Sequence, residues 1–520
     1  LGDVLTGGVA SSQSSPSFQI ICCTRSWTML PLKSLRKASV AFTRLCQCKD
    51  IVRACSSDGG GKKSKFVVDE DPPERRAFKI LRDEFRGYMK PKSSEVQEPL
   101  FPKEVDILVV GGGIMGSSIA YWLKQRAPES FTLGVLERDL TYARSSTVLS
   151  IGGIRQQFSL PENVQLSMFS AEFLRNVKQN LSVLDFDPPD IQFQPHGYLF
   201  LASEKGADQM LKNAEMQEEL GAKIELLRPD ELRKQFPWIN TDGIALASHG
   251  LENEGWFDPY ALLTALRRKS VSLGARYLNA ELVDFEFESI NAQRGPEISY
   301  EPVNHAVVRT PDGVIRRITF AILVVAAGPH SGEVAKLLRV GTGPGLLEVP
   351  LPVEPRKRYV YVVQCPDGPG LNFPLVVTPD GVYCRREGLG GHYVCGKSPP
   401  PDEEPDVGDL DVDYSFFDKA VWPTLAHRIP AFKSLKVKSA WAGFYDYNTL
   451  DQNGCVGRHP CYNNVFFATG FSGHGIQMAP GVGRAIMELI IDGKFVSIDL
   501  KRFGLERFIH QEPIKEANIV

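Results

Sequence analysis

Hydrophobic and polar positions along the chain predict short strands that alternate with amphipathic helices from about residue 104 to residue 500. The run VDILVV, residues 105–110, is apolar enough for a strand buried on both faces. A helical periodicity follows up to Pro128, and its inward side chains are expected to be Ile119, Trp122 and Leu123. FTLGVLERD then predicts a second strand that ends at Glu137. This strand–helix–strand order is typical of a parallel sheet covered by helices.

Three glycines stand between the first strand and its helix, and Gly111, Gly113 and Gly116 fit the pattern GxGxxG. The first permits a tight turn, the second lets a pyrophosphate approach the backbone, and the third lets helix and strand pack closely. Glu137 lies 21 residues past Gly116 and can accept hydrogen bonds from ribose hydroxyls, although it would repel the 2′-phosphate of NADP. The segment predicts a dinucleotide site and leaves FAD and NAD both open.

Two later strands also end in small residues. ILVVAAGPHS, residues 322–331, runs into Ala326, Ala327 and Gly328, and FFATGFSGHG, residues 466–475, runs into a glycine-rich turn before a helix. Such ends leave room for a flat ring or a phosphate, and a helix N-terminus can stabilise negative charge on a reduced flavin. Ordinary buried strands with tight turns are the alternative.

A second unit is predicted by segments in which apolar and polar residues alternate as in an antiparallel sheet: 193–204, 351–365 and 381–396. The segment 255–275 predicts a loop followed by an amphipathic helix. Asp258, which precedes Pro259, is expected to cap that helix rather than to take part in chemistry.

The glycine-rich segments, the run from Arg144 to Thr147 and SIGGIRQQFS (150–159) together resemble the FAD-dependent D-amino-acid oxidase superfamily over residues 104–500. The most similar branch is that of sarcosine oxidase and dimethylglycine dehydrogenase. The resemblance implies an α/β, Rossmann-like FAD-binding domain interleaved with an antiparallel-sheet α+β substrate domain. The FAD-binding domain would comprise residues 104–192, 256–345 and 436–500, and the substrate domain 193–255 and 346–435, before a C-terminal tail, 501–520.

The resemblance also implies which residues bind FAD: Gly111, Gly113, Ile114, Met115, Gly116, Glu137, Arg138, Ser145, Ser146, Thr147, Gly153, Ala327, Gly328, Gly470, Gly473, His474, Gly475, Ile476 and Gln477. Relatives that tether flavin use a Cys near the segment matching Gly443–Phe444, or a His in the stretch matching STVLS, where this chain has Leu149. The lysine that activates oxygen in sarcosine oxidase falls on Val394, and a carboxylate-anchoring lysine falls on Gln477. These departures favour non-covalent FAD and a dehydrogenase rather than an oxidase, and they leave sarcosine in doubt as the substrate.

Amine oxidation by a flavin is mainly hydride transfer, which depends on placing the substrate. Arg or Lys usually anchors a substrate carboxylate, and the candidates are Arg155, Arg356, Arg385 and Lys397. Aromatic walls could come from Tyr359, Tyr383, Tyr445 and Tyr447. We expect the catalytic residues to be His474, Arg155, Lys397 and Tyr383. The alternatives are solvated charges, packed rings and, for His474, a turn histidine bonded to the backbone.

The first hundred residues have a different composition. The stretch from Met29 to residue 55 has spaced basic residues and a single acid, Asp50, as in a mitochondrial transit peptide, whereas a disordered basic tail is the alternative. Residues 1–28 are expected to be upstream sequence, and 56–103 a linker that contains a short amphipathic helix at 74–89.

Charge and hydropathy exclude some partners. The net charge is −3, which argues against bulk attraction to nucleic acid, and no run is long and apolar enough for a membrane span. The cysteines lack zinc spacing, and no metal site is expected. The runs 351–362 and 441–454 resemble a mitochondrial branch associated with assembly of respiratory complex I. That resemblance implies a matrix location, complex I subunits or assembly proteins as partners, and at most peripheral contact with the inner membrane.

Three functions stay open. The first is a flavoenzyme that oxidises an amine or amino acid. The second is a catalytically silent assembly factor that keeps FAD as a structural or redox-sensing element. An NAD-dependent dehydrogenase is a distant third, because it would not need the GFSGHG segment.

Overall fold

The computed structural model describes residues 101–287 and 303–517. All of them lie within one compact unit, residues 98–520. The expectations for the leader, the linker and its helix at 74–89 fall outside the described residues. Within the described parts of the chain, no helix combines the length and the apolar character that crossing a bilayer would require.

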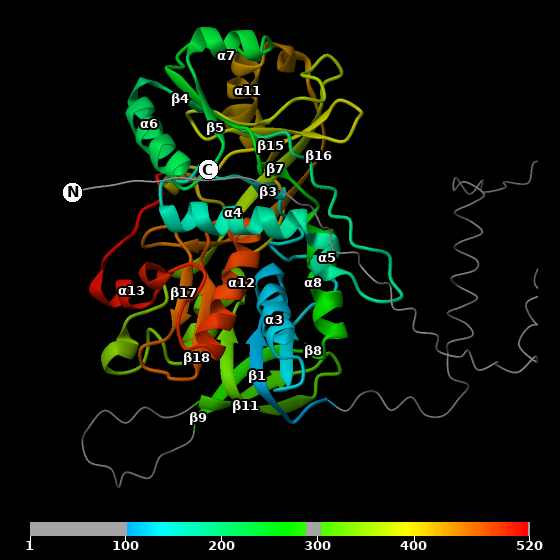
Figure 1. Ribbon diagram of the computed structural model, residues 1–520, viewed down its shortest axis with the longest axis vertical. Coiled ribbons are helices and arrows are strands. Elements are labelled where there is room, and N and C mark those ends of the chain that lie inside the picture. The colour runs from blue at the N-terminus through cyan, green and yellow to red at the C-terminus, as the bar shows by residue number, and fades with distance from the viewer. Residues whose placement is uncertain (1–100, 288–302, 518–520) are drawn as a thin grey trace, which may run out of the picture. The chain divides into compact units, whose positions relative to one another are not determined.

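The first sheet has the strand order β17–β18–β11–β1–β2–β8, and β10 and β9 extend from β11 (Figure 1). Its central strand β1 pairs in parallel with β11 and with β2. β1 is therefore an interior strand, and its apolar residues are buried as the sequence predicts. The strands are β1 (Glu104–Val110), β2 (Leu133–Glu137), β8 (Ala275–Asn279), β9 (Glu281–Phe287), β10 (Val303–Arg309), β11 (Ile315–Val325), β17 (Cys455–Arg458) and β18 (Val465–Thr469).

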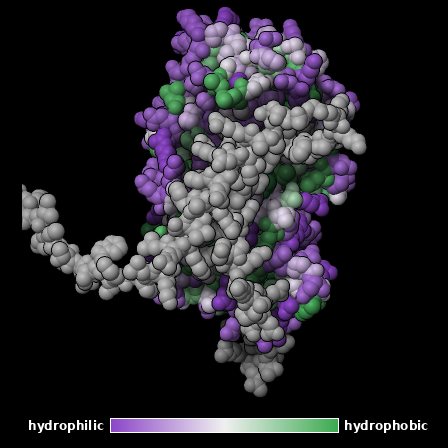
Figure 2. Space-filling view, turned by 90° about the vertical axis from the view of Figure 1, so that its right-hand side faces the viewer, coloured by the Kyte–Doolittle hydropathy of each residue, from purple (hydrophilic) through white to green (hydrophobic). Residues whose placement is uncertain are grey.

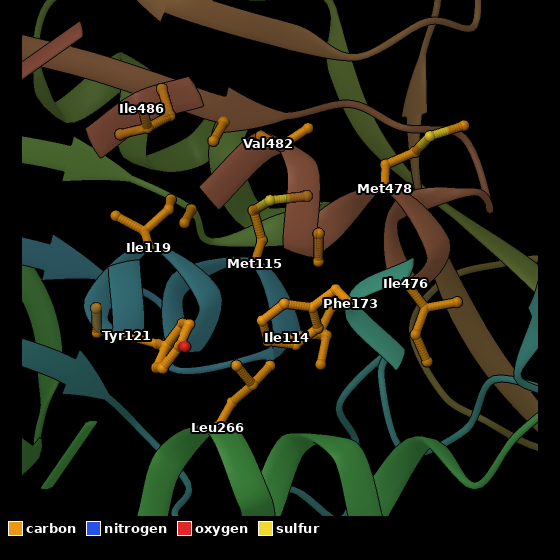
Figure 3. Close-up of a cluster of buried hydrophobic side chains, with 14 of the residues drawn as sticks. Ile114, Met115, Ile119, Tyr121, Phe173, Leu266, Ile476, Met478, Val482 and Ile486 are labelled. Atoms are coloured by element: carbon orange, nitrogen blue, oxygen red, sulfur yellow. The ribbon is translucent and has the colours of Figure 1, made fainter. Parts of the chain in front are cut away.

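Helices cover one face of this sheet. They are α3 (Ile114–Arg126), α4 (Pro161–Arg175) followed by α5 (Val177–Leu181), α8 (Pro259–Ser272) and α12 (Gly475–Ile491). Figure 3 shows α3 between α12 and α8, with Ile119 facing Val482 and Ile486 on one side and Leu266 approaching from the other. The cap of α8 is confirmed, because the Asp258 carboxylate accepts hydrogen bonds from the backbone N–H groups of Tyr260 and Ala261. This packing fixes the position of two helix N-termini, those of α3 and α12.

The second sheet has the order β16–β12–β15–β14–β13–β4–β6–β5 and occupies the upper half of Figure 1. Its neighbours pair antiparallel except β13 and β4, which are parallel. The strands are β4 (Tyr198–Ala202), β5 (Ile224–Leu227), β6 (Leu246–Gly250), β12 (Val353–Gln364), β13 (Leu375–Val377), β14 (Tyr383–Glu387), β15 (His392–Gly396) and β16 (Lys436–Asn448). The predicted antiparallel unit is therefore present.

Alternation along these strands separates two faces. Tyr361, Cys384 and Tyr393 belong to a hydrophobic core on the outer face, which also takes side chains from α7 (Pro229–Gln235) and α11 (Trp422–Arg428). Tyr198, Leu375 and Tyr383 form a smaller cluster on the inner face. Residues of the inner face line the candidate active site.

Two expected boundaries change. Residues 436–448 were assigned to the FAD-binding domain by resemblance, but β16 pairs along its length with β12 in the second sheet, so the chain returns to the first sheet only at β17. Residues 501–517, expected as a C-terminal tail, pack against the core, because Phe503, Leu505 and Phe508 are buried and Arg507 forms an ion pair with buried Asp451 at 2.8 Å. A two-stranded sheet, β3 (Gly153–Ile154) with β7 (Gly255–Trp256), links the two halves.

The surface carries no extended apolar area on the visible part of the face in Figure 2, where hydrophobic residues stand in small groups among hydrophilic ones. The large exposed hydrophobic residues are correspondingly scattered in the chain, as at Leu184, Leu389 and Val496. Scattered exposure of this kind is ordinary for a protein surface.

Candidate active site

A cavity of about 460 Å³ runs from the carboxyl ends of the first sheet's parallel strands to the inner face of the second sheet. One end is lined by the turn after β1 and by Ala327 and Gly328 after β11. The other end is lined by residues of β4, β12, β13, β14 and β16. Open α/β sheets bind ligands at this edge, where the strands end and helices begin.

The glycine turn has no room for side chains. Gly111 has φ +104°, and a Cβ atom there would fall 2.3 Å from the carbonyl oxygen of Ala326. A Cβ atom on Gly116 would fall 1.9 Å from the carbonyl oxygen of Gly111. Gly116 does not line the cavity; it lets α3 approach β1, which places the helix N-terminus at the cavity.

Polar groups surround this turn. The N–H of Gly112 donates to Glu137 Oε2 at 2.8 Å, and the N–H of Ile114 donates to Thr147 Oγ1 at 3.0 Å. The buried Ser146 hydroxyl has no hydrogen-bond partner among the described residues. An open backbone turn, a carboxylate at the end of β2 and an unsatisfied hydroxyl fit the pyrophosphate and ribose of FAD.

Arg138 lies on the same side of the cavity. Its Nη2 lies 2.7 Å from His330 Nε2, and His330 Nδ1 lies 3.2 Å from a carboxylate oxygen of Glu333. Arginine has no acceptor, so His330 Nε2 must accept. Burial, and next the charge of Arg138, lower the pKa of His330. The neutral ring therefore holds the Arg138 side chain against the cavity wall.

His474 and Arg155 meet where α12 begins. Arg155 is 2% exposed, and its Nη2 donates to His474 Nε2 at 3.0 Å. Burial, and next the charge of Arg155, lower the pKa of His474 to about 3. His474 is therefore neutral, and its acceptor nitrogen is already occupied, so it is suited to positioning Arg155 rather than to general-base catalysis.

Gln477, in the first turn of α12, fixes the backbone of the same arginine. Its Oε1 accepts from the Arg155 N–H at 2.9 Å. The Arg155 guanidinium also packs on two aromatic rings, 4.1 Å from the centroid of Phe158 and 4.9 Å from that of Phe200. A buried, rigidly held guanidinium that lines a cavity is a suitable anchor for a carboxylate.

Most of the residues that the resemblance assigned to FAD do line the cavity, including Gly111, Gly113, Ile114, Met115, Glu137, Arg138, Ser145, Ser146, Thr147, Gly153, Ala327, Gly328, Gly473, His474, Gly475, Ile476 and Gln477. Gly116 and Gly470 do not line the cavity. Their lack of a side chain instead lets neighbouring segments pack closely. Gly470 has φ +76°, and a Cβ atom there would fall 2.9 Å from Val353 Cγ2.

Of the candidates for chemistry, His474, Arg155, Tyr383 and Tyr445 line the cavity, whereas Lys397 does not. Lys397 Nζ instead pairs with Asp380 Oδ2 at 3.3 Å, so its expected catalytic role has no support in the geometry. Tyr359 belongs to the core on the outer face of the second sheet. The remaining three, Arg356, Arg385 and Tyr447, also lie outside the cavity lining.

Several lining residues were not anticipated, among them three with polar side chains on the second sheet: Tyr198, Arg358 and Asp446. Arg358 precedes Tyr359 on β12, so the two side chains point to opposite faces of the sheet. Had Tyr359 been known to lie on the outer face, alternation would have placed Arg358 on the inner face, toward the cavity. Tyr198 carries the only polar side-chain group in the strand YLFLA, and that hydroxyl was the available signal. Asp446 accepts from the N–H of Phe471 at 3.0 Å, and burial raises its pKa to about 6.

The two positions where relatives tether flavin face each other. A Cβ atom on Gly443 would fall 3.1 Å from Leu149 Cβ, and Trp441 Nε1 donates to the Leu149 carbonyl at 2.8 Å. Val394, where an oxygen-activating lysine was sought, is buried, and it pairs with Arg385 across β14 and β15. No lysine lines the cavity in the parts of the chain that the structure describes. Those parts also hold no cluster of three or more metal-ligand side chains.

Comparisons with known proteins agree with this geometry. The family model described as FAD dependent oxidoreductase (DAO) matches residues 106–489. FAD-dependent oxidoreductase domain-containing protein 1 of Xenopus laevis is 56% identical over 427 residues, covering 81% of this chain and 85% of that protein. The Drosophila melanogaster homolog of that protein is 40% identical, covering 92% and 98%. L-proline dehydrogenase from P. horikoshii superposes with a TM-score of 0.66 at 26% identity, covering 80% of this chain and 100% of that one.

Proposed function

The chain belongs to the FAD-dependent oxidoreductase family, and from that premise we propose that it is a dehydrogenase for an amine or amino acid. The observation that carries the proposal is one cavity with the dinucleotide turn at one end and the buried guanidinium of Arg155 further along it. FAD, once bound, supplies a ring that accepts a hydride from a carbon beside nitrogen. Arg155 would hold the substrate carboxylate, and apolar residues that line the cavity, such as Leu375 and Val377, would exclude water.

Dehydrogenation, rather than rapid oxidation by oxygen, is supported by the cavity lining. The position matched to the oxygen-activating lysine of sarcosine oxidase is Val394, and among the described residues the lining cations are arginines. With the Leu149 and Gly443 positions also lacking a nucleophile, we propose that FAD is held non-covalently and passes electrons to a carrier.

The holoprotein tests this proposal directly. Under anaerobic conditions, an N-methylated or free amino acid should bleach the visible flavin band, and an added quinone should restore it faster than oxygen does. Arg155→Met should raise the substrate KM strongly while FAD content stays near stoichiometric. Lys397→Met is the matched control, and its KM should equal that of the wild type because Lys397 lies outside the cavity lining.

A yellow protein that no amine or amino acid bleaches would contradict the enzymatic proposal and favour an FAD-binding assembly factor. If Lys397→Met raised KM as much as Arg155→Met, the assignment of Arg155 as the anchor would be wrong. Faster reoxidation by oxygen than by quinone would identify an oxidase.

We also propose that the protein acts in the mitochondrial matrix, with complex I subunits or assembly proteins as partners. The basic composition of residues 29–55 and the likeness of 351–362 and 441–454 support this. Fractionation of cells expressing the tagged full chain, followed by native separation of respiratory complexes, tests it. Absence from mitochondria, or normal complex I after depletion, would contradict it.

A further inference from the structure

Three tyrosines from different strands meet at the end of the cavity that lies against the second sheet. Tyr198 opens β4, Tyr383 opens β14 and Tyr445 lies in β16, and all three line the cavity. None of their hydroxyl groups forms a hydrogen bond to a described residue. We call this set the tyrosine wall.

Glycines allow two of these rings to reach the backbone near the expected flavin site. A Cβ atom on Gly153 would fall 1.9 Å from the Tyr198 hydroxyl oxygen. A Cβ atom on Gly473 would fall 2.7 Å from the Tyr445 ring. Side chains at either glycine would displace these tyrosines, so the wall and the glycine-rich segments fit one another.

The positive charge around the wall comes from three guanidinium groups. Arg155 and Arg385 act on Tyr198, Arg385 and Arg358 act on Tyr383, and Arg358 acts on Tyr445. Burial outweighs these arginines and raises the pKa of each hydroxyl, so all three stay protonated and can donate hydrogen bonds at neutral pH. The wall is thus a set of hydrogen-bond donors among three arginines.

Arg358 is held rigidly. Its Nη1 and Nη2 donate to the two oxygens of Glu404 at 2.7 and 2.9 Å, and its guanidinium lies 5.2 Å from the Tyr445 ring centroid. Asp446, the acid beside Tyr445, already accepts from the N–H of Phe471. Glu404 offsets the charge of Arg358, so the tyrosine hydroxyl groups provide most of the attraction for an anion at this end of the cavity.

Donors and guanidinium groups recognise carboxylates and would repel an ammonium group. This inference rests on the proposed function, in which Arg155 takes the first carboxylate. Tyr198, on which the charge of Arg155 acts, would bind the same carboxylate, so the hydroxyl groups of Tyr383 and Tyr445 are available for another acidic group. We propose that Tyr383 and Tyr445, oriented by Arg358, form a second carboxylate subsite, and that the substrate is an amine or amino acid with two carboxylates.

Two sulfur analogues that cannot be dehydrogenated at nitrogen test the subsite without turnover. Thiodiacetate carries two carboxylates, and (methylthio)acetate carries one. Each is titrated into the oxidised holoprotein, and the change in the visible flavin spectrum gives its Kd. Thiodiacetate should bind at least about tenfold more tightly, as expected for additional hydrogen bonds to a charged group. Equal affinities, or no spectral change with either compound, would overturn the proposal.

Tyr445→Phe removes only a hydroxyl, and it should weaken thiodiacetate about tenfold while leaving the Kd of (methylthio)acetate unchanged. Tyr260→Phe, at an exposed position on α8, is the control and should change neither. Equal weakening of both compounds by Tyr445→Phe would indicate a general effect on the site and would refute the subsite. Because the titration needs no turnover, it can succeed even if no amine bleaches the flavin, and the proposed function can stand even if it fails.

Discussion

Glu254 is a buried carboxylic acid beside the Arg155 segment, and replacing it with Gln should remove one part of the dependence of the protein's stability on pH. The side chain is 1% exposed. Its Oε1 accepts from the N–H of Gln156 at 2.9 Å, whereas Oε2 has no partner among the described residues. Burial raises the pKa of Glu254 to about 8, from an ordinary value of 4.5, even though the Gln156 N–H and Arg155 lower it.

The direction of the change in the free energy of unfolding with pH follows from proton binding. Between pH 4.5 and about 8 the folded protein keeps a proton on Glu254 that the unfolded chain has lost. The free energy of unfolding therefore falls as pH rises through this range. The full difference between the two pKa values corresponds to about 5 kcal/mol, because each pH unit is worth about 1.4 kcal/mol.

Gln cannot ionise, so Glu254→Gln should match the wild type near pH 4.5 and become the more stable protein by several kcal/mol, about 3 to 5, near pH 8.5. The measurement is the free energy of urea unfolding at both pH values. Glu252→Gln, at an exposed neighbouring position, is the control and should follow the wild type at both. Parallel pH responses of Glu254→Gln and the wild type would refute the reasoning.

Three further outcomes are expected. Glu137→Ala should weaken FAD binding to the apoprotein by about 10- to 100-fold in a fluorescence titration, since hydrogen bonds to a charged group contribute about 1.5–3 kcal/mol. Gly116→Ala should yield protein with little flavin absorbance, because the new Cβ would fall 1.9 Å from the Gly111 carbonyl oxygen. Asp451→Asn should lower the free energy of unfolding by about 3–5 kcal/mol, because it leaves Arg507 buried without its ion-pair partner.

The glycine and aspartate variants each have a matched control. Gly206→Ala, where a Cβ atom would make an ordinary 3.6 Å contact, should keep full flavin absorbance. Asp499→Asn disrupts an exposed pair with Lys501 and should change stability little. Unchanged FAD affinity in Glu137→Ala would contradict the assignment of Glu137 to the ribose. Full flavin content in Gly116→Ala would contradict the close packing of α3 on β1. Equal losses of stability in Asp451→Asn and Asp499→Asn would contradict the importance of burial for the ion pair.

The sequence by itself determined the dinucleotide site, because its signals are local. A buried strand, three glycines, a helix and a terminal acid are contiguous from Glu104 to Glu137, and each was placed as expected. The Asp258 cap is local in the same way. These features depend on backbone conformation and short-range hydrogen bonds, which neighbouring residues control.

Tertiary structure alone decided which side chains share the cavity. Adjacent positions such as Arg358 and Tyr359 point to opposite faces of β12, and only the packing of the second sheet decides which face meets the site. Lys397 and Arg155 were equivalent candidates in the sequence, yet one pairs with Asp380 and the other reaches His474, 319 residues away. Side-chain direction repeats every two residues in a strand, but the orientation of a sheet depends on contacts between distant segments, which no local pattern records.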